Sequence, residues 1–299
     1  MSITYGTPGR VSFGWITESW QLFSSQAGIW IVAMLALVAP TALFGAAFYI
    51  YLLVNMFPAG FPPPAPVPGA APFPTPGTNP FFTNSSMTEP ILIWEGVFGV
   101  TMLLYYSFLY GGLFQMAVNQ VRGLSIAYRD IFSGGRLFGR MLGAMLLLGL
   151  AGYATEFIAV GPGLLRLWLS PHAMTAIIAA FVFGILILMC LGLILWGLLL
   201  PAFALMADGE PIFGALRRSV RGMKAQWLPA AGFVFVLGLL VYASEIPCGI
   251  GLLATIPMVF LICALAYRDL VGMPNMAPPP VPGYAPAAPG VWPPPPGPQ

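Results

Sequence analysis

Long apolar runs separated by short polar connectors dominate this chain. The runs lie at 29–54, 91–118, 141–158, 173–200, 228–245 and 249–267. Most of them reach the roughly 20 residues that an α-helix needs to cross the bilayer core. The pattern therefore predicts an all-α polytopic membrane protein with six transmembrane helices.

The connectors carry a second pattern, in which apolar residues recur at helical spacing with charges on the opposite side. The clearest case follows Pro211, where one face holds Phe213, Leu216, Val220, Met223 and Trp227. A similar stripe places Phe13, Ile16, Trp20 and Phe23 on one face of residues 11–25, with Glu18 off it. A weaker stripe runs through 122–140. These stripes predict amphipathic helices lying at the membrane interface.

Parts of the chain are repeated at a fixed offset. Tyr153-Ala-Thr-Glu156 returns as Tyr242-Ala-Ser-Glu245, and each is followed by a Pro/Gly-rich stretch. Tyr128-Arg-Asp130 returns as Tyr267-Arg-Asp269 at the exit of another apolar run. Such repetition indicates a duplicated supersecondary unit. It predicts three helical-hairpin repeats, at 11–118, 122–207 and 211–270, each preceded by an amphipathic interfacial helix. The two Pro/Gly-rich stretches, at 161–163 and 246–251, are predicted hairpin turns.

Three segments do not fit the membrane pattern. Residues 55–90 and 271–299 are rich in proline, which favours extended, solvated chain over helix. Residues 1–10 are polar. The sequence predicts a flexible N-terminus at 1–10, a Pro-rich extracytoplasmic loop at 55–90 and a disordered Pro-rich cytoplasmic tail at 271–299, around a transmembrane domain at 11–270.

Composition agrees with the membrane assignment and adds an orientation. The chain is 59% hydrophobic and 7% charged, against about 25% charged for soluble domains. Nearly all basic residues fall in connectors on one side of the six predicted spans, and Arg166 alone falls on the other. The positive-inside rule then predicts cytoplasmic N- and C-termini.

Glu156 and Glu245 are the leading candidates for a polar site, with Tyr153 and Tyr242 one helical turn away. Ionisable residues at membrane depth often mark a substrate or ion path. Two interpretations stay open: the pair lines such a path at a repeat interface, or both carboxylates reach interfacial water and cap backbone amides.

A second group of candidates consists of basic residues in the connectors, suited to anionic lipid headgroups. They are Arg129, Arg136, Arg140, Arg217, Arg218, Arg221, Lys224 and Arg268. Setting the topology is the alternative role for the same residues.

The sequence contains no recognisable catalytic motif. His172 is the only histidine, the three cysteines have no metal-ligand spacing, and there is no phosphate-binding loop, HExxH or GxSxG motif. The sequence predicts a non-enzymatic membrane protein with no cofactor or metal and no nucleic-acid partner, acting through membrane lipids or through a protein partner at the Pro-rich tail. The alternative is a small-molecule or lipid transporter that uses the glutamate pair.

Short motifs in the second half resemble a known group of proteins. They are Pro201-Ala-Phe-Ala-Leu-Met-Ala-Asp-Gly209, Ala215-Leu-Arg-Arg-Ser219, Trp227-Leu-Pro229 and Ala266-Tyr-Arg-Asp-Leu270. The chain resembles bacterial six-helix membrane proteins of unknown function, related to the membrane domain fused to some glycerophosphodiester phosphodiesterases. The resemblance implies a bacterial inner-membrane protein. It supplies no catalytic residues, because in those fusions the activity belongs to a separate soluble domain.

Overall fold

The computed structural model describes residues 9–56, 85–169, 174–246 and 249–273. The described residues contain helices and no strands. The elements are α1 (Gly14–Ser25), α2 (Ala27–Met56), α4 (Ser85–Val121), the 3₁₀ helix η1 (Tyr128–Arg136), α5 (Phe138–Leu169), α6 (Met174–Leu199), α7 (Ala202–Ala207), α8 (Ile212–Met223), η2 (Lys224–Gln226), α9 (Trp227–Glu245), α10 (Leu252–Ala266) and the π-helix η3 (Tyr267–Gly272).

Six helical stretches within the described residues are long and apolar enough to cross a membrane. They are Ala27–Tyr51, Gly96–Val121, Phe138–Gly163, Phe181–Ala207, Ile212–Glu245 and Leu252–Gly272. Many large apolar side chains on them are exposed in the protein alone, as expected for surfaces that face lipid. The predictions of an all-helical fold and of six helices long and apolar enough to cross a membrane are confirmed for the described residues.

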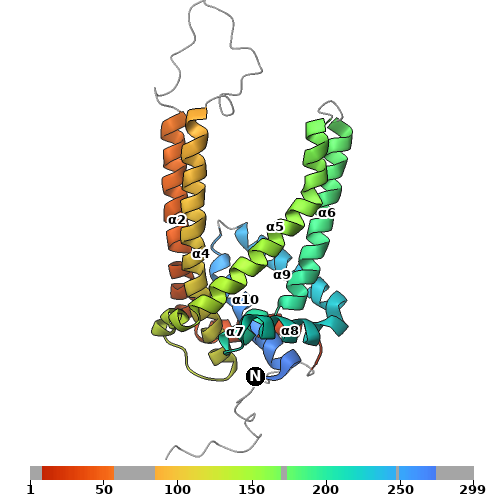
Figure 1. The fold of residues 1–299 in the computed structure, drawn as a ribbon. Coiled ribbons are helices and arrows are strands. Elements are labelled where there is room, and N and C mark those ends of the chain that lie inside the picture. The colour runs from red at the N-terminus through yellow and green to blue at the C-terminus, as the bar shows by residue number, and fades with distance from the viewer. Residues whose placement is uncertain (1–8, 57–84, 170–173, 247–248, 274–299) are drawn as a thin grey trace, which may run out of the picture.

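The helices share one base and diverge from it (Figure 1). The α2/α4 pair and the α5/α6 pair extend upward in the view, with α9 and α10 behind and between them. The short elements α1, η1, α7, α8 and η3 gather at the lower end and are called the basal layer below.

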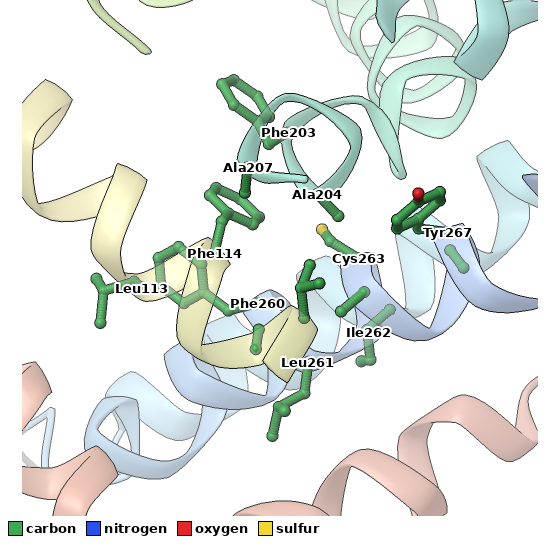
Figure 2. Packing of buried hydrophobic residues seen from close by; sticks show 14 of the residues in the cluster. Leu113, Phe114, Phe203, Ala204, Ala207, Phe260, Leu261, Ile262, Cys263 and Tyr267 are labelled. Atoms are coloured by element: carbon green, nitrogen blue, oxygen red, sulfur yellow. The ribbon is translucent and has the colours of Figure 1, made fainter. Parts of the chain in front are cut away.

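Helix α10 is the central element of this arrangement. It contacts α1, α2, α4, α7 and α9. Within the apolar part of its membrane-spanning stretch 61% of the residues are buried, compared with 12% in the stretch that lies in α5. Figure 2 shows its residues Phe260, Ile262 and Cys263 packed among side chains of α4 and α7. The core therefore lies where α10 meets the basal layer.

The turn predicted at 161–163 is wrong. Helix α5 continues through Pro162 to Leu169, so the connection to α6 lies at 170–173, outside the described residues. Proline removes one backbone hydrogen bond but is tolerated inside membrane helices, where neighbouring groups satisfy the freed carbonyl. The matching stretch of the third unit does end its helix, because α9 stops at Glu245.

The helix predicted from the stripe in 122–140 is also wrong in part. Residues 124–127 are not helical, and Tyr128–Arg136 forms a 3₁₀ helix. The reason is a backbone contact with α4: a Cβ placed on Gly134 would lie 1.9 Å from the carbonyl oxygen of Phe108, and one on Gly112 would lie 1.9 Å from that of Ile131. Glycine at both positions lets the two backbones touch.

Helices α1 and α8 form where the apolar stripes predict helices, and each buries only part of its surface in the protein. Helix α1 buries Trp15, Glu18, Ser19 and Phe23, whereas Phe13 is exposed. Helix α8 buries Ala215, Ser219 and Met223, with Phe213 left 74% exposed. Exposed aromatic residues of both stripes, such as Phe13 and Phe213, leave apolar surface that the protein itself does not cover.

The Pro-rich predictions lie mostly outside the described residues. Of the predicted loop at 55–90, residues 55–56 end α2 and 85–90 begin α4, while 57–84 are not described. The tail from 274 and residues 1–8 are likewise outside the described ranges.

The Gly134 contact generates a stability prediction. Gly134→Ala should lower the stability of the folded protein by about 1–3 kcal/mol, because its methyl group collides with a backbone oxygen that has no room to move. The measurement is the apparent melting temperature in detergent, followed by the loss of the monodisperse peak on size exclusion. Gly139→Ala in α5 is the control, since its Cβ would meet nothing within 4 Å; equal stability of the two variants would contradict the contact.

Candidate functional site

A cavity of about 640 Å³ lies at the centre of the bundle. Helices α2, α4, α5, α6, α7, α9 and α10 all contribute to its wall. Its size falls within the range of about 300–1,000 Å³ that is typical of small-molecule sites. No position along the sequence indicated this cavity, because each helix contributes only a few separated apolar residues.

The cavity has a closed floor and an open rim. Its floor includes Phe114, Phe203, Phe260 and Cys263, all buried. Figure 2 shows these four side chains where α4, α7 and α10 meet. At the rim, Val38, Gly149 and Trp196 are exposed, and Trp196 is 58% exposed. The exposed rim residues therefore lie on α2, α5 and α6.

Aromatic rings pack against one another in the floor. The ring of Phe114 stacks on that of Phe203 with centroids 5.3 Å apart, and it meets Phe260 edge-on at 4.7 Å. Such pairs each contribute about 0.5–1.5 kcal/mol beyond the burial of their area. The wall has few polar groups, and one of them, the hydroxyl of Tyr106, is already hydrogen-bonded to Thr41 Oγ1 at 2.5 Å. The cavity is thus suited to an apolar ligand.

A second hollow, of about 580 Å³, lies between α5 and α6 and is called the α5/α6 groove below. Leu148, Trp196 and Leu199 line both the groove and the central cavity, so the two spaces adjoin. Thr155 and Glu156 are the polar residues in its wall. The Thr155 hydroxyl donates to the carbonyl of Ala151 at 2.7 Å.

The structure separates the glutamate pair. Glu156 lines the α5/α6 groove, whereas Glu245 ends α9 and lines none of the cavities described here. Both side chains are exposed, and so are Tyr153 and Tyr242, at 73% and 74%. Within the described residues, therefore, the four candidates do not meet in one enclosed polar cavity.

Two ionic clusters lie in the basal layer. In the first, Arg268 forms ion pairs with Glu18 at 2.5 Å and with Asp269 at 2.7 Å. Trp15 Nε1 donates to the same Asp269 carboxylate at 2.8 Å. The Arg268 side chain is only 7% exposed. It ties α1 to the end of α10, and its guanidinium is bound to carboxylates of the protein, where the sequence predicted a lipid headgroup.

The second cluster, called the Asp208 junction below, joins three segments. Arg122 Nη2 lies 2.6 Å from Asp208 Oδ1, and the Tyr267 hydroxyl donates to Asp208 Oδ2 at 2.6 Å. Arg122 follows α4, Asp208 follows α7 and Tyr267 opens η3. The carboxylate therefore fixes the basal ends of the three helix pairs relative to one another.

The remaining basic candidates differ in their surroundings. Arg140 is half-buried, and Arg218 pairs with Glu210. The residues with exposed side chains are Arg129, Arg136, Arg217, Arg218, Arg221 and Lys224. They form an exposed basic surface on η1, α8 and η2.

The two Tyr-Arg-Asp motifs have different roles. Tyr267 is buried on Asp208, and Asp269 is part of the Arg268 cluster. In the other copy Tyr128 is exposed, and Asp130 accepts a hydrogen bond from the backbone N–H of Ala127 at 2.8 Å. The copy at 128–130 thus caps the first turn of η1 and does not join distant elements.

In the described part of the chain, no three His, Cys, Asp or Glu side chains come together as a metal site. His172 and Cys248 lie outside the described residues. No family model, curated protein or solved structure matches this chain. The resemblance to the phosphodiesterase-associated membrane domains stays a prediction.

The Asp208 junction generates a prediction with an internal control. Asp208→Ala should destabilise the protein by about 3–5 kcal/mol, because it leaves the largely buried Arg122 without its counter-charge. Glu210→Ala removes the partner of Arg218, whose side chain is 45% exposed, and should cost less than about 1 kcal/mol. Apparent melting temperatures of the two variants in the same detergent measure the difference, and a ranking in the reverse order would rule out the structural role of the junction.

Proposed function

We propose that this protein is a non-enzymatic integral membrane protein that binds the apolar chain of a lipid in its central cavity. The cavity carries the proposal: it is large, almost entirely apolar, and bordered by exposed residues of α2, α5 and α6. A cavity of this kind inside a membrane protein can be entered laterally by a hydrocarbon chain. Its wall offers no arrangement of nucleophile, base and oxyanion donors that would support a reaction.

The basal layer supports a second part of the proposal. Exposed arginine and lysine side chains of η1, α8 and η2 lie beside exposed aromatic residues such as Phe132 and Phe213. Basic and aromatic residues together are typical of segments that rest on an anionic membrane surface. We infer that this layer faces the cytoplasm of a bacterial inner membrane. The inference rests on the positive-inside rule and on the resemblance described above.

Two other proposals have less support. A transporter that uses Glu156 and Glu245 as a pair requires the two carboxylates to converge, and they line no common cavity in the described residues. A protein partner at the Pro-rich tail concerns residues from 274 onward, which are not described. Neither is carried by an observation comparable to the central cavity.

Cys263 on the cavity floor allows a direct test of chain binding. In a Cys190→Ser/Cys248→Ser background, delipidated protein should react at Cys263 with an apolar maleimide at alkaline pH, and slowly, because burial in apolar surroundings disfavours the thiolate that attacks the reagent. Adding hexadecanol at about ten times its Kd should slow that reaction about tenfold, because a bound chain covers the thiol. The measurement is the labelling rate, followed by intact-protein mass spectrometry.

A matched pair of variants in α9 gives the control. Val241 lines the cavity, so Val241→Trp should abolish protection while leaving thermal stability unchanged or higher, as expected for filling a void. Val236 lies on the same helix but is exposed and outside the cavity wall, so Val236→Trp should retain protection. Hexadecanol that fails to slow labelling in the parent protein would contradict the proposal.

The basic surface generates a separate prediction. Replacing Arg217, Arg221 and Lys224 with glutamine should weaken the preference for anionic lipid in nanodiscs by about 1 kcal/mol for each charge removed. The measurement is the fraction of phosphatidylglycerol retained by native mass spectrometry, at low and high salt. The charge-preserving control Arg217→Lys/Arg221→Lys/Lys224→Arg should keep the preference; its loss in this control would show that the charge is not the cause.

A further inference from the structure

The α5/α6 groove continues the central cavity toward Glu156. Leu148, Gly152 and Glu156 follow one another at one-turn intervals along α5, so they form a single stripe. Leu148, Trp196 and Leu199 belong to the cavity wall as well as to the groove wall. A chain that fills the cavity can therefore leave it past Trp196 and end beside Glu156.

Small residues keep the groove open. Gly152 on α5 and Gly192 on α6 both line it, and a Cβ on either glycine would meet no atom within 4 Å. Glycine in a helix interior is less favourable than alanine by about 1 kcal/mol. No close helix contact at these two positions offsets that cost. The empty space beside them is the groove itself.

The polar end of the groove offers acceptors and no donor with a free hydrogen. Glu156 forms no ion pair or hydrogen bond with any described residue. The Thr155 hydroxyl hydrogen is already donated to the carbonyl of Ala151, which leaves its oxygen as an acceptor. The rest of the described wall is leucine, isoleucine and glycine, and Trp196, whose indole N–H is a donor, lies at the end that adjoins the central cavity. A carboxylate in such surroundings requires a cationic partner that donates hydrogen bonds.

We propose that the α5/α6 groove selects single-chain membrane amphiphiles with an ammonium group, whose charge is met by Glu156 while the chain extends into the central cavity. This proposal rests on the proposed function, because it assigns the polar end of the same ligand. The occupant comes from the membrane, since both spaces lie among the spanning helices. Glu156 is a binding residue here and has no catalytic role.

The repeated sequence supplies the matched control. Glu245 occupies the corresponding place in Tyr242-Ala-Ser-Glu245, is exposed like Glu156, and lines neither the groove nor the central cavity. A difference between Glu156→Gln and Glu245→Gln would therefore report on the groove and not on the general loss of an exposed carboxylate.

The test compares three ligands with the same chain: hexadecylamine, hexadecanol and hexadecanoate. Each is titrated into phosphatidylcholine nanodiscs that hold the Cys190→Ser/Cys248→Ser protein, and the labelling rate of Cys263 is measured. Hexadecylamine should protect Cys263 at a concentration about tenfold lower than hexadecanol, with hexadecanoate the weakest, because a hydrogen bond to a charged group adds about this factor. Glu156→Gln should remove the preference for the amine and leave protection by hexadecanol intact. Glu245→Gln should keep the preference.

A second variant tests the path of the ligand. Gly152→Leu should fill the groove without loss of thermal stability, because a Cβ at this position meets no atom within 4 Å and leucine favours the helix more than glycine does. It should reduce protection by hexadecylamine to the level of hexadecanol.

Specific outcomes would overturn the proposal. An amine preference that survives in Glu156→Gln, or that disappears equally in Glu245→Gln, shows that the groove does not recognise the ammonium group. A dimer in native mass spectra that Glu156→Gln dissociates shows that a second copy of the chain occupies the groove instead. If hexadecanol protects Cys263 and the amine is no better, the groove proposal fails and the cavity function stands. If no ligand protects Cys263, the cavity function itself fails.

Discussion

One carboxylate holds the basal ends of the three helix pairs together. The Asp208 carboxylate forms an ion pair with Arg122, which follows α4. It also accepts a hydrogen bond from the hydroxyl of Tyr267, which follows α10. Each of the two bonds joins segments far apart in the sequence. Removing one partner of a largely buried charge pair leaves the other uncompensated, which costs more than the pair itself contributes. The relative positions of α4, α7 and α10 therefore depend on this junction more than on any single apolar contact.

The junction also explains where the cavity lies. Cys263 on α10 comes one helical turn before Tyr267, which opens η3, and Phe203 on α7 comes five residues before Asp208. Fixing Tyr267 and Asp208 thus fixes the cavity floor directly above them. Toward the other end, α2/α4 and α5/α6 diverge (Figure 1). Apolar surfaces there gain little from packing on one another, because lipid chains are equally apolar. Because the helix pairs are joined at the basal layer and diverge toward their other ends, an apolar cavity remains between them.

The parts of the fold that depend on composition could be predicted from the sequence, and the parts that depend on contacts between distant residues could not. Six apolar runs were enough to predict six spans. The burial of Glu18 could not be predicted, because its partner Arg268 lies 250 positions away in the sequence. The conformation of 128–136 was missed because Gly112 and Gly134 admit a backbone contact that side-chain periodicity does not record. The central cavity could not be predicted either, because its wall is assembled from residues of seven helices far apart in the sequence.

The glutamate repeat shows how equal sequence gives unequal surroundings. Both copies carry Tyr-Ala-(Thr/Ser)-Glu followed by glycine and proline. In the second copy the chain turns after Glu245, which leaves that carboxylate at the end of α9. In the first copy α5 passes through Pro162 and continues to Leu169, so Glu156 stays within a helix that runs beside α6. A carboxylate at a helix end can reach water at low cost, whereas one along an apolar helix pair needs a partner from outside the chain. The position at which the helix ends, and not the sequence motif, therefore determines which of the two glutamates lies in the proposed ligand groove.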